Sequence, residues 1–259
     1  MDITLFMPNE NEKPLDHLVS DGGMTAILRS VACIGDSLSS GEFEGRDELG
    51  NKTYHDMFDH SWGQYLARMS GITVRNFSRG GMTAEEYCRS FADQNGFFDP
   101  ALACNAYIIA LGVNDLYHRD ANYGSVDTLD PENLCQHDGS FIGYYAEIVG
   151  RLRAFRPDAK FFFMTMPRDN FPEAIGDKHR ELLYALAEIV PNSYVLDLRT
   201  YGPEYDAAFR KQFYLGGHMN PAGYLLTAKM VASYIDYIIR HNMRDFKEVG
   251  FIGTPHGSK

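Results

Sequence analysis

The chain has 259 residues, of which 44% are hydrophobic, and its formal net charge at pH 7 is -11. This length fits one α/β domain with insertions, and the hydrophobic content is ordinary for a globular protein with a full core. The negative charge and the isoelectric point near 5.2 argue against nucleic acid or an anionic membrane as a partner. No run of about 18 apolar residues occurs, so no membrane-spanning segment is predicted.

The N-terminal residues have neither a basic start nor a sustained apolar run, so no signal peptide is visible. We therefore expect a cytoplasmic protein, unless a signal peptide has been removed. Residues 1–25 are predicted to form an N-terminal extension, residues 26–245 the main domain, and residues 246–259 a C-terminal tail.

Five short apolar runs are the predicted strands, at residues 27–34, 72–77, 105–111, 159–165 and 193–198. Between and after them, apolar residues recur at helical spacing, at residues 62–69, from Thr83 onward, and at 140–155, 173–190 and 221–241. This alternation of strands and helices predicts βαβ units and a parallel sheet. The expected fold is a three-layer α/β/α sandwich around a central five-stranded parallel sheet.

The four cysteines, Cys33, Cys88, Cys104 and Cys135, lack metal-ligand spacing and lie mostly in apolar or helical contexts. We expect them to be reduced, buried thiols, and we expect no metal site.

The first predicted strand ends in Ile34-Gly35-Asp36-Ser37-Leu38. A serine hydroxyl is a poor nucleophile unless it projects from a fixed turn toward a base and an anion-stabilising pocket. Leu38-Ser39-Ser40 indicates that the turn enters a short helix, whose amide groups would favour negative charge. Taken alone, Ser37 could equally cap that helix.

Three further segments could supply the other parts of such a site. They are 76–84, with Gly80-Gly81; 112–115, with Asn114; and 217–224, with His218. The first two, like Ser37, come just after a predicted strand, and ligands of open parallel sheets bind at the carboxyl ends of the strands. We therefore expect one site built from four loops.

The residues 39–60 and 116–138 have no steady periodicity, and each directly follows one of these segments. Both are predicted to overhang the site as substrate-shaping loops, with Phe43, Tyr117 and His118 as the candidate contacts. The alternative is that they are surface loops with scattered aromatic residues.

With these segments the chain resembles the SGNH hydrolases, also called GDSL esterases/lipases, over about residues 26–240. The resemblance implies the flavodoxin-like strand order 2-1-3-4-5, with Ser37 as nucleophile and His218 as general base. It also implies an oxyanion hole made of the N–H groups of Ser37 and Gly81 and the side-chain amide of Asn114. Gly80 is the alternative to Gly81.

The chain departs from the family pattern three residues before the histidine, where an Asp usually orients the imidazole. Leu215 stands there, and no carboxylate occurs between Asp206 and His218. A backbone carbonyl near Leu215 or Gly216 could hold His218 in a Ser-His dyad. An acid from elsewhere, such as Asp197 or Glu204, could take the role, or the site could be inactive.

The sequence therefore predicts a serine esterase that needs no metal or organic cofactor. The expected substrate is a small-molecule or carbohydrate ester with a small acyl group such as acetyl. The alternative is a non-catalytic module that binds an acylated glycan. A flavodoxin-like phosphate cradle at Gly80-Gly81 is disfavoured, because that loop is short, lacks a following Lys and gives His218 no role. The oligomeric state is left open.

Overall fold

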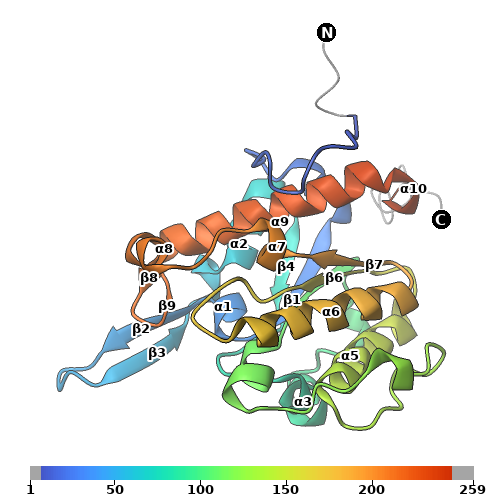
Figure 1. The fold of residues 1–259 in the computed structure, drawn as a ribbon, viewed down its shortest axis with the longest axis horizontal. Helices are drawn as coiled ribbons and strands as arrows, with labels where there is room; N and C mark the ends of the chain where they lie inside the picture. The colour runs from blue at the N-terminus through green and yellow to red at the C-terminus, as the bar shows by residue number, and fades with distance from the viewer. Residues whose placement is uncertain (1–6, 247–259) are drawn as a thin grey trace.

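The computed structural model describes residues 7–246, and its centre is a five-stranded parallel sheet (Figure 1). The strands are β1 (Ser30–Gly35), β4 (Thr73–Asn76), β5 (Ala106–Ala110), β6 (Lys160–Met164) and β7 (Ser193–Leu196). They lie in the order β4-β1-β5-β6-β7, and every neighbouring pair is parallel. Counted along the chain as five strands, this is the order 2-1-3-4-5, so the predicted fold class is confirmed.

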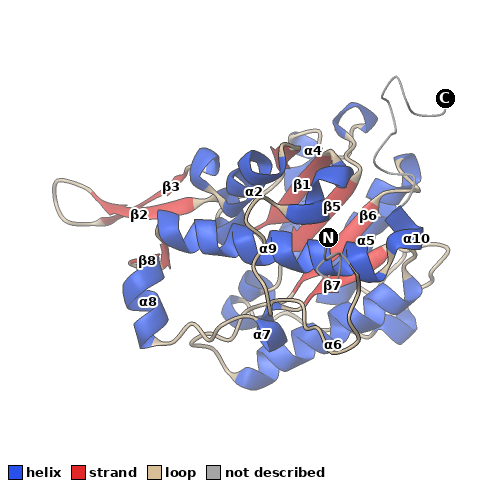
Figure 2. Cartoon of the chain, turned by 90° about the horizontal axis from the view of Figure 1, so that it is seen from above, coloured by secondary structure: helices blue, strands red, loops and turns tan. Residues whose placement is uncertain are grey.

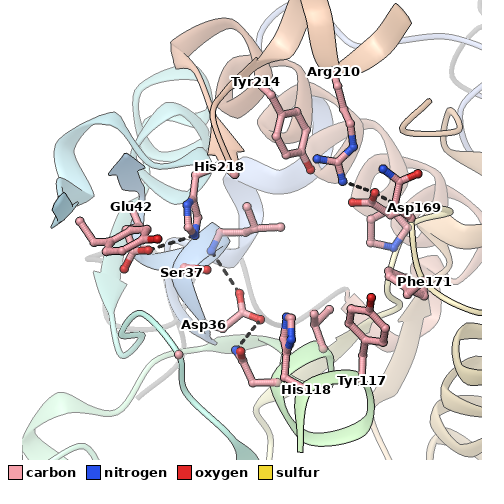
Figure 3. Close-up of a pocket in the computed structure, with 18 residues that line it drawn as sticks. Asp36, Ser37, Glu42, Tyr117, His118, Asp169, Phe171, Arg210, Tyr214 and His218 are labelled. Carbon is pink, nitrogen blue, oxygen red and sulfur yellow. Dashed lines mark hydrogen bonds and ion pairs between the residues drawn. The ribbon is translucent and has the colours of Figure 1, made fainter. Parts of the chain in front are cut away.

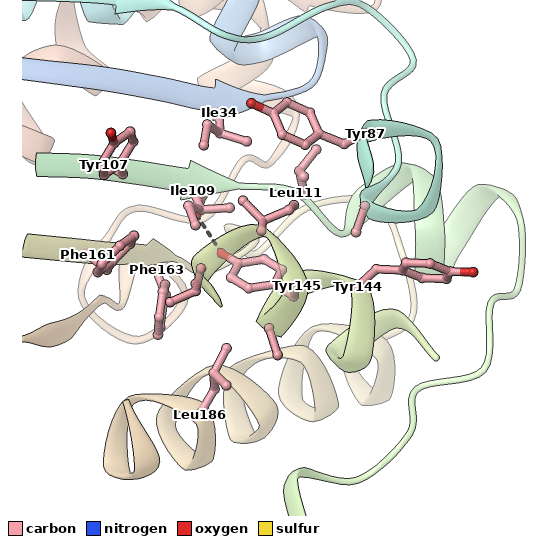
Figure 4. Packing of buried hydrophobic residues seen from close by; sticks show 14 of the residues in the cluster. Ile34, Tyr87, Tyr107, Ile109, Leu111, Tyr144, Tyr145, Phe161, Phe163 and Leu186 are labelled. Atoms are coloured by element: carbon pink, nitrogen blue, oxygen red, sulfur yellow. Dashed lines mark hydrogen bonds between the residues drawn. The ribbon is translucent and has the colours of Figure 1, made fainter. Parts of the chain in front are cut away.

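Helices α5 (Phe141–Phe155) and α6 (Glu173–Ile189) cover one face of the sheet (Figures 1 and 4). Side chains alternate between the faces of a strand, so Ile34 and Ile109 point toward these helices. Tyr145 of α5 reaches the sheet, where its hydroxyl donates to the carbonyl oxygen of Ile109 at 2.7 Å. The buried phenol is thus satisfied, and helix and sheet are joined through the core.

Helices α2 (Trp62–Ser70) and α9 (Pro221–His241) cover the opposite face. The intervening strand residues Cys33, Ile108 and Phe162 belong to this second cluster, and all are fully buried. Both faces of the sheet are therefore covered, which explains why the three central strands β1, β5 and β6 read as nearly continuous apolar runs.

Capping residues mark where the helices of this region begin and end. Helix α2 begins after Ser61, whose hydroxyl accepts from the N–H of Gln64, and it ends at Gly71 with φ 66°. Helix α3 (Ala84–Glu86) begins after Thr83, whose hydroxyl accepts from the N–H of Glu86. These caps satisfy amide groups that the first turn of a helix leaves free.

The remaining α-helices are short. They are α1 (Ser37–Ser40), α4 (Ala92–Gln94), α7 (Leu198–Tyr201), α8 (Ala207–Phe213) and α10 (Met243–Phe246), and a π-helical turn (Tyr87–Phe91) joins α3 to α4. Within residues 7–246, no helix is both long enough and apolar enough to cross a membrane.

Two antiparallel pairs lie outside the central sheet. Strands β2 (Glu42–Arg46) and β3 (Lys52–Asp56) form a hairpin that projects from the body of the molecule (Figure 2). Strands β8 (Tyr214–Leu215) and β9 (His218–Met219) pair across a two-residue turn. The hairpin occupies the segment 39–60, for which the sequence predicts a loop.

The start of the first strand differs from the prediction. Residues 23–28 form a 3-10 helix, and β1 begins only at Ser30. Gly22 with φ 87° and Arg29 with φ 63° bracket this helix. Left-handed backbone interrupts a strand, so the apolar residues Ile27 and Leu28 pack against the domain without joining the sheet.

The described part of the N-terminal extension lies along α9. The N–H of Val19 donates to the hydroxyl of Ser233 at 2.9 Å, and Arg240 pairs with Glu12 at 2.6 Å. The boundaries proposed at residues 25 and 245 stay predictions. The predicted C-terminal tail falls outside the described residues, except for Phe246, which is buried.

All four cysteines are free thiols. Cys33, Cys88 and Cys104 are buried, as expected from their apolar surroundings. Cys135 is exposed, contrary to the prediction, because it lies in the irregular segment that precedes α5.

Candidate active site

A cavity of about 500 Å³ lies where the carboxyl ends of β1, β5 and β6 meet the hairpin and the β8-β9 turn (Figure 3). Its lining includes six of the predicted site residues: Ser37, Gly81, Asn114, Tyr117, His118 and His218. These residues come from segments far apart in the sequence. The structure thus brings the four motif segments together around one cavity.

Ser37 is the first residue of α1, directly after β1. Asp36 caps this helix, and its carboxylate accepts from the N–H of Leu38 at 3.1 Å. A Cβ at Gly35 would lie 2.2 Å from the hydroxyl oxygen of Ser39, so the turn needs a glycine at that position. The tight strand-to-helix turn therefore fixes the backbone of Ser37 beside the cavity.

Gly81 borders the cavity, and its φ of 71° lies in the region that favours glycine. The N–H of neighbouring Gly80 points instead toward the carboxylate of Asp56, at 3.5 Å. The geometry therefore favours Gly81 over Gly80 as the source of a backbone donor to a ligand.

Asn114 lies in a π-helical turn, Val113–His118, that follows β5. Its side-chain nitrogen donates to the carbonyl oxygen of Met82 at 3.2 Å and to a carboxylate oxygen of Asp36 at 3.4 Å. The amide is thereby held between two segments of the site. An oxyanion would have to share one of these N–H groups, so the predicted role of Asn114 stays a prediction.

Asp36 and Asp115 support the backbone of the site. Asp115 accepts from the N–H of Ala84 at 2.8 Å and so links the loop after β5 to helix α3. Burial raises the pKa of Asp36 to about 6 and that of Asp115 to about 7. Both carboxyl groups bond backbone amides of the loops beside the two motifs.

His218 begins β9, and Asn220 and Pro221 then start α9. Its side chain is 16% exposed, and its Nε2 lies 2.9 Å from Oε1 of Glu42. Nδ1 is buried and has no hydrogen-bond partner among the described residues. Burial lowers the pKa of His218, while the nearby carboxylates of Glu44 and Asp56 act in the opposite direction.

Among the described residues, none of the partners that the sequence suggests for the imidazole bonds Nδ1, the nitrogen that does not face Glu42. Because Nδ1 makes no hydrogen bond within residues 7–246, a backbone carbonyl near Leu215 or Gly216 does not hold it. Leu215 is half exposed and is paired with His218 in the β8-β9 ladder.

Asp197 caps α7, where it accepts from the N–H of Thr200 and pairs with Arg180 at 2.6 Å. The other acid considered, Glu204, belongs to a segment that bridges to Arg168. Neither acid lines the cavity.

The carboxylate that reaches His218 belongs to Glu42, the first residue of β2. Burial, together with the carboxylates of Asp56 and Asp36, raises the pKa of Glu42. Nothing in the sequence singles out Glu42, because it lies in a segment without periodicity and 176 residues before the histidine it contacts.

Charged side chains and aromatic rings form the wall of the cavity across from His218 (Figure 3). Arg210 of α8 forms an ion pair with Asp169, and Tyr214 and Phe171 lie beside them. Tyr117 packs against Phe171, with ring centroids 5.8 Å apart. Only Tyr117 and His118 were predicted for this wall. The segment after β6 also lies at the carboxyl edge of the sheet, which is the signal that could have pointed to residues 167–171.

Phe43 lies away from the cavity. Its ring packs against Tyr224 at 5.5 Å and His60 at 6.2 Å, at the base of the hairpin. The aromatic hairpin residue that lines the cavity is Tyr54, whose ring meets His218 edge-on at 5.8 Å. Alternation along β2 explains the difference, because Glu42 and Phe43 point to opposite faces of the hairpin.

Comparison with known proteins gives a family match over most of the chain. The model of the GDSL-like lipase/acylhydrolase family matches residues 33–226. A search of curated proteins found no match. In the described residues, no group of three or more His, Cys, Asp or Glu side chains is arranged to hold a metal ion.

Solved structures with the same fold include a family two carbohydrate esterase from Clostridium thermocellum in complex with cellohexaose. It is 16% identical, with a TM-score of 0.58 over 84% of this chain and 65% of that chain. A carbohydrate esterase family 2 enzyme with a carbohydrate-binding domain, from Corynascus thermopiles, is 18% identical, with a TM-score of 0.53 over 80% and 65%. A protein from Lactobacillus plantarum is 19% identical, with a TM-score of 0.55 over 81% and 97%. At these identities the likeness shows the fold alone.

Proposed function

The chain belongs to the GDSL-like lipase/acylhydrolase family, and from that premise we propose that it is a serine esterase that hydrolyses a small-acyl ester. The observation that carries the proposal is the convergence of Ser37, Gly81, Asn114 and His218, from four separate segments, on one cavity. Family membership supports hydrolysis in general, and the arrangement of the cavity supports the roles given to each residue.

In the proposed reaction, Oγ of Ser37 attacks the ester carbonyl carbon while its proton passes to His218. The N–H groups of Ser37 and Gly81 and the amide of Asn114 would stabilise the oxyanion. The bond to the alcohol then breaks, and the alcohol oxygen takes the proton from His218. Water repeats the sequence on the acyl-serine, which releases the acid and restores Ser37.

We propose an acetylated carbohydrate as the substrate class. Two structures with the same fold are carbohydrate esterases. The cavity is lined by the aromatic rings of Tyr54, Tyr117, Phe171 and Tyr214 and by charged groups. Its volume of about 500 Å³ lies within the range of small-molecule sites.

The test is hydrolysis of p-nitrophenyl acetate, butyrate and octanoate by the wild type, Ser37→Ala and His218→Ala. We expect activity to fall with acyl length and to be lost in both variants. Release of acetate from an acetylated xylan or cello-oligosaccharide would then test the substrate class. Activity retained by Ser37→Ala would contradict the proposed nucleophile.

A second candidate is a non-catalytic module that binds an acylated glycan. The leucine at position 215 favours it, because the acid that usually orients the histidine is absent from that position. A fluorophosphonate separates the two candidates, since it reacts rapidly only with an activated serine. Glycan binding without labelling of Ser37 would support the module.

A further inference from the structure

The hairpin β2-β3 contacts the turn that carries His218 at several points. Oε2 of Glu44 accepts from the N–H of Gly217 at 2.8 Å, and its Oε1 pairs with Lys52 at 3.0 Å. Tyr54 meets the ring of His218 edge-on at 5.8 Å. Through these contacts the hairpin supports the β8-β9 turn that carries the histidine.

Glu42 makes the most direct of these contacts, because its Oε1 lies 2.9 Å from Nε2 of His218. Its side chain is 13% exposed, so solvent screens the pair less than it would a surface pair. Tyr224 of α9 fixes the backbone here, as its hydroxyl donates to the carbonyl oxygen of Glu42 at 2.7 Å.

The neighbouring acids are engaged elsewhere. Asp56 accepts from the hydroxyl of Ser40, and Glu44 is held by Lys52 and Gly217. Among residues 7–246, His218 is the one ion-pair partner of the Glu42 carboxylate. Glu42 is thus the carboxylate placed to respond to the charge of the imidazole.

Gly80 makes room for this arrangement. A Cβ at position 80 would lie 2.1 Å from Oε2 of Glu42, and φ at this residue is not in the left-handed region. The constraint on Gly80 is therefore space rather than backbone conformation. A methyl group there would displace the carboxylate of Glu42 and leave its charge in place.

We propose that Glu42 is the positioning residue of His218, and that its carboxylate stabilises the imidazolium formed during ester hydrolysis. This inference rests on the proposed function. Because Nε2 of His218 faces Glu42, Nδ1 is the nitrogen left to take the proton of Ser37. The positive charge then develops on a ring whose Nε2 lies 2.9 Å from Oε1 of Glu42, in a mostly buried site. The proton then leaves with the alcohol, and Glu42 is unchanged. The hairpin thereby supplies the carboxylate that a leucine at position 215 does not provide.

The charges around this pair come from several elements. Asp36 lies at the start of α1, and Glu44, Lys52 and Asp56 lie on the hairpin. The rings of Tyr54 and Tyr224 lie beside the pair. Removing the charge of Glu42 leaves His218 with less negative surroundings, so its pKa should fall. Only the unprotonated imidazole acts as a base. The acidic limb of the kcat/KM profile should therefore move to lower pH.

The experiment compares Glu42→Gln, Gly80→Ala and Glu48→Gln with the wild type. Glu48→Gln is the matched control, because it removes the same charge from the exposed end of the same hairpin. For Glu42→Gln we expect kcat for p-nitrophenyl acetate to fall by about 10²- to 10⁴-fold with KM changed less than about threefold, and the acidic limb to shift downward. Gly80→Ala should lower kcat less, and Glu48→Gln should match the wild type.

The rate of Ser37 labelling by a fluorophosphonate, followed by intact mass, separates failure of this inference from failure of the proposed function. Rapid labelling of the wild type and an equal rate in Glu42→Gln would overturn the role of Glu42 and leave the esterase proposal standing. An unmoved acidic limb would reduce Glu42 to a structural residue. No labelling of the wild type would overturn both proposals. Circular dichroism establishes that each variant is folded.

Discussion

Ser37 and His218 face the same cavity but are supported in different ways. Ser37 follows directly from the buried strand β1, and the neighbouring loops after β4 and β5 continue from the same sheet. His218 lies in a two-residue strand outside that sheet, and the β2-β3 hairpin holds it. The serine side is therefore fixed by the core of the domain, whereas the histidine side depends on a few contacts at the surface.

This difference predicts different consequences for changes on the two sides. Alterations beside Ser37 should affect folding stability together with activity, because the same backbone serves both. Alterations in the hairpin should affect activity while stability changes little. Variants on the two sides therefore test whether activity and stability can be separated.

The largest effect concerns the two reacting residues. Ser37→Ala and His218→Ala should each lower kcat by about 10⁴- to 10⁶-fold, and the double variant should be no worse than either single variant, because the two groups act as a unit. Steady-state kinetics on p-nitrophenyl acetate measures this. Additive losses in the double variant would show that the two residues do not act in one step.

Asn114→Ala should lower kcat by about 10²- to 10³-fold, which is typical for the loss of one oxyanion donor. Because Asn114 also bonds Met82 and Asp36, its removal should lower the melting temperature as well. Kinetics and thermal unfolding of the same samples check both expectations. An unchanged kcat would remove Asn114 from the oxyanion hole.

The buried imidazole of His179 makes the stability of the core beneath the serine side depend on pH. It is fully buried, and its Nε2 lies 3.1 Å from the carbonyl oxygen of Leu111, just below the loop that carries Asn114. Burial lowers its pKa from 6.5 to about 4. The unfolded chain therefore binds more protons than the folded one between these values, and stability should rise with pH across that window.

Relative to His179→Gln, the wild type should lose up to about 3 kcal/mol of unfolding free energy from this residue as the pH falls from 6.5 to 4. Urea unfolding of both proteins at several pH values measures the difference. Because Asp36 and Asp115 titrate in the same range in both proteins, the comparison removes their contribution. A difference that stays constant with pH would contradict the buried neutral imidazole.

Gly81→Ala should cost about 1–2 kcal/mol of stability, because φ at this residue is 71° and a Cβ disfavours that conformation. The space around it is open, with no heavy atom within 4 Å of the position that a Cβ would take, so the cost comes from the backbone. Chemical unfolding measures it, and kcat should fall in parallel. An unchanged free energy of unfolding in Gly81→Ala would mean that the loop adjusts its backbone to accommodate the Cβ.

The smallest effect is expected for Glu44 of the hairpin. Glu44→Ala removes the acceptor of the Gly217 N–H and should lower kcat by roughly two- to tenfold. We expect the melting temperature to stay near that of the wild type, as measured by calorimetry. A large loss of stability would break the contrast, because it would make the hairpin part of the folding core.

The sequence predicts the serine side well because local rules govern it. Apolar runs mark all five strands of the sheet, and the caps at Ser61, Thr83 and Asn220 lie where the residue types indicate. Motif residues that follow strands of a parallel sheet must meet at its carboxyl edge. Ser37 and Asn114 therefore meet as a consequence of topology.

The histidine side depends on tertiary contacts that leave no local pattern. Glu42 and Tyr54 lie in a hairpin whose polar, irregular sequence resembles a loop. Phe43 was the expected contact because it is aromatic, but the alternation of the strand directs it to the other face. Arg210 and Asp169 likewise become part of the cavity only when α8 and the loop after β6 fold against each other.

The most direct test of the central claim is the reaction of the intact protein with a fluorophosphonate, followed by mass spectrometry of the whole chain and of its peptides. An activated Ser37 predicts one adduct per chain on Ser37, lost in Ser37→Ala and formed far more slowly in His218→Ala. No adduct, or an adduct on another residue that is indifferent to His218→Ala, would contradict a serine esterase.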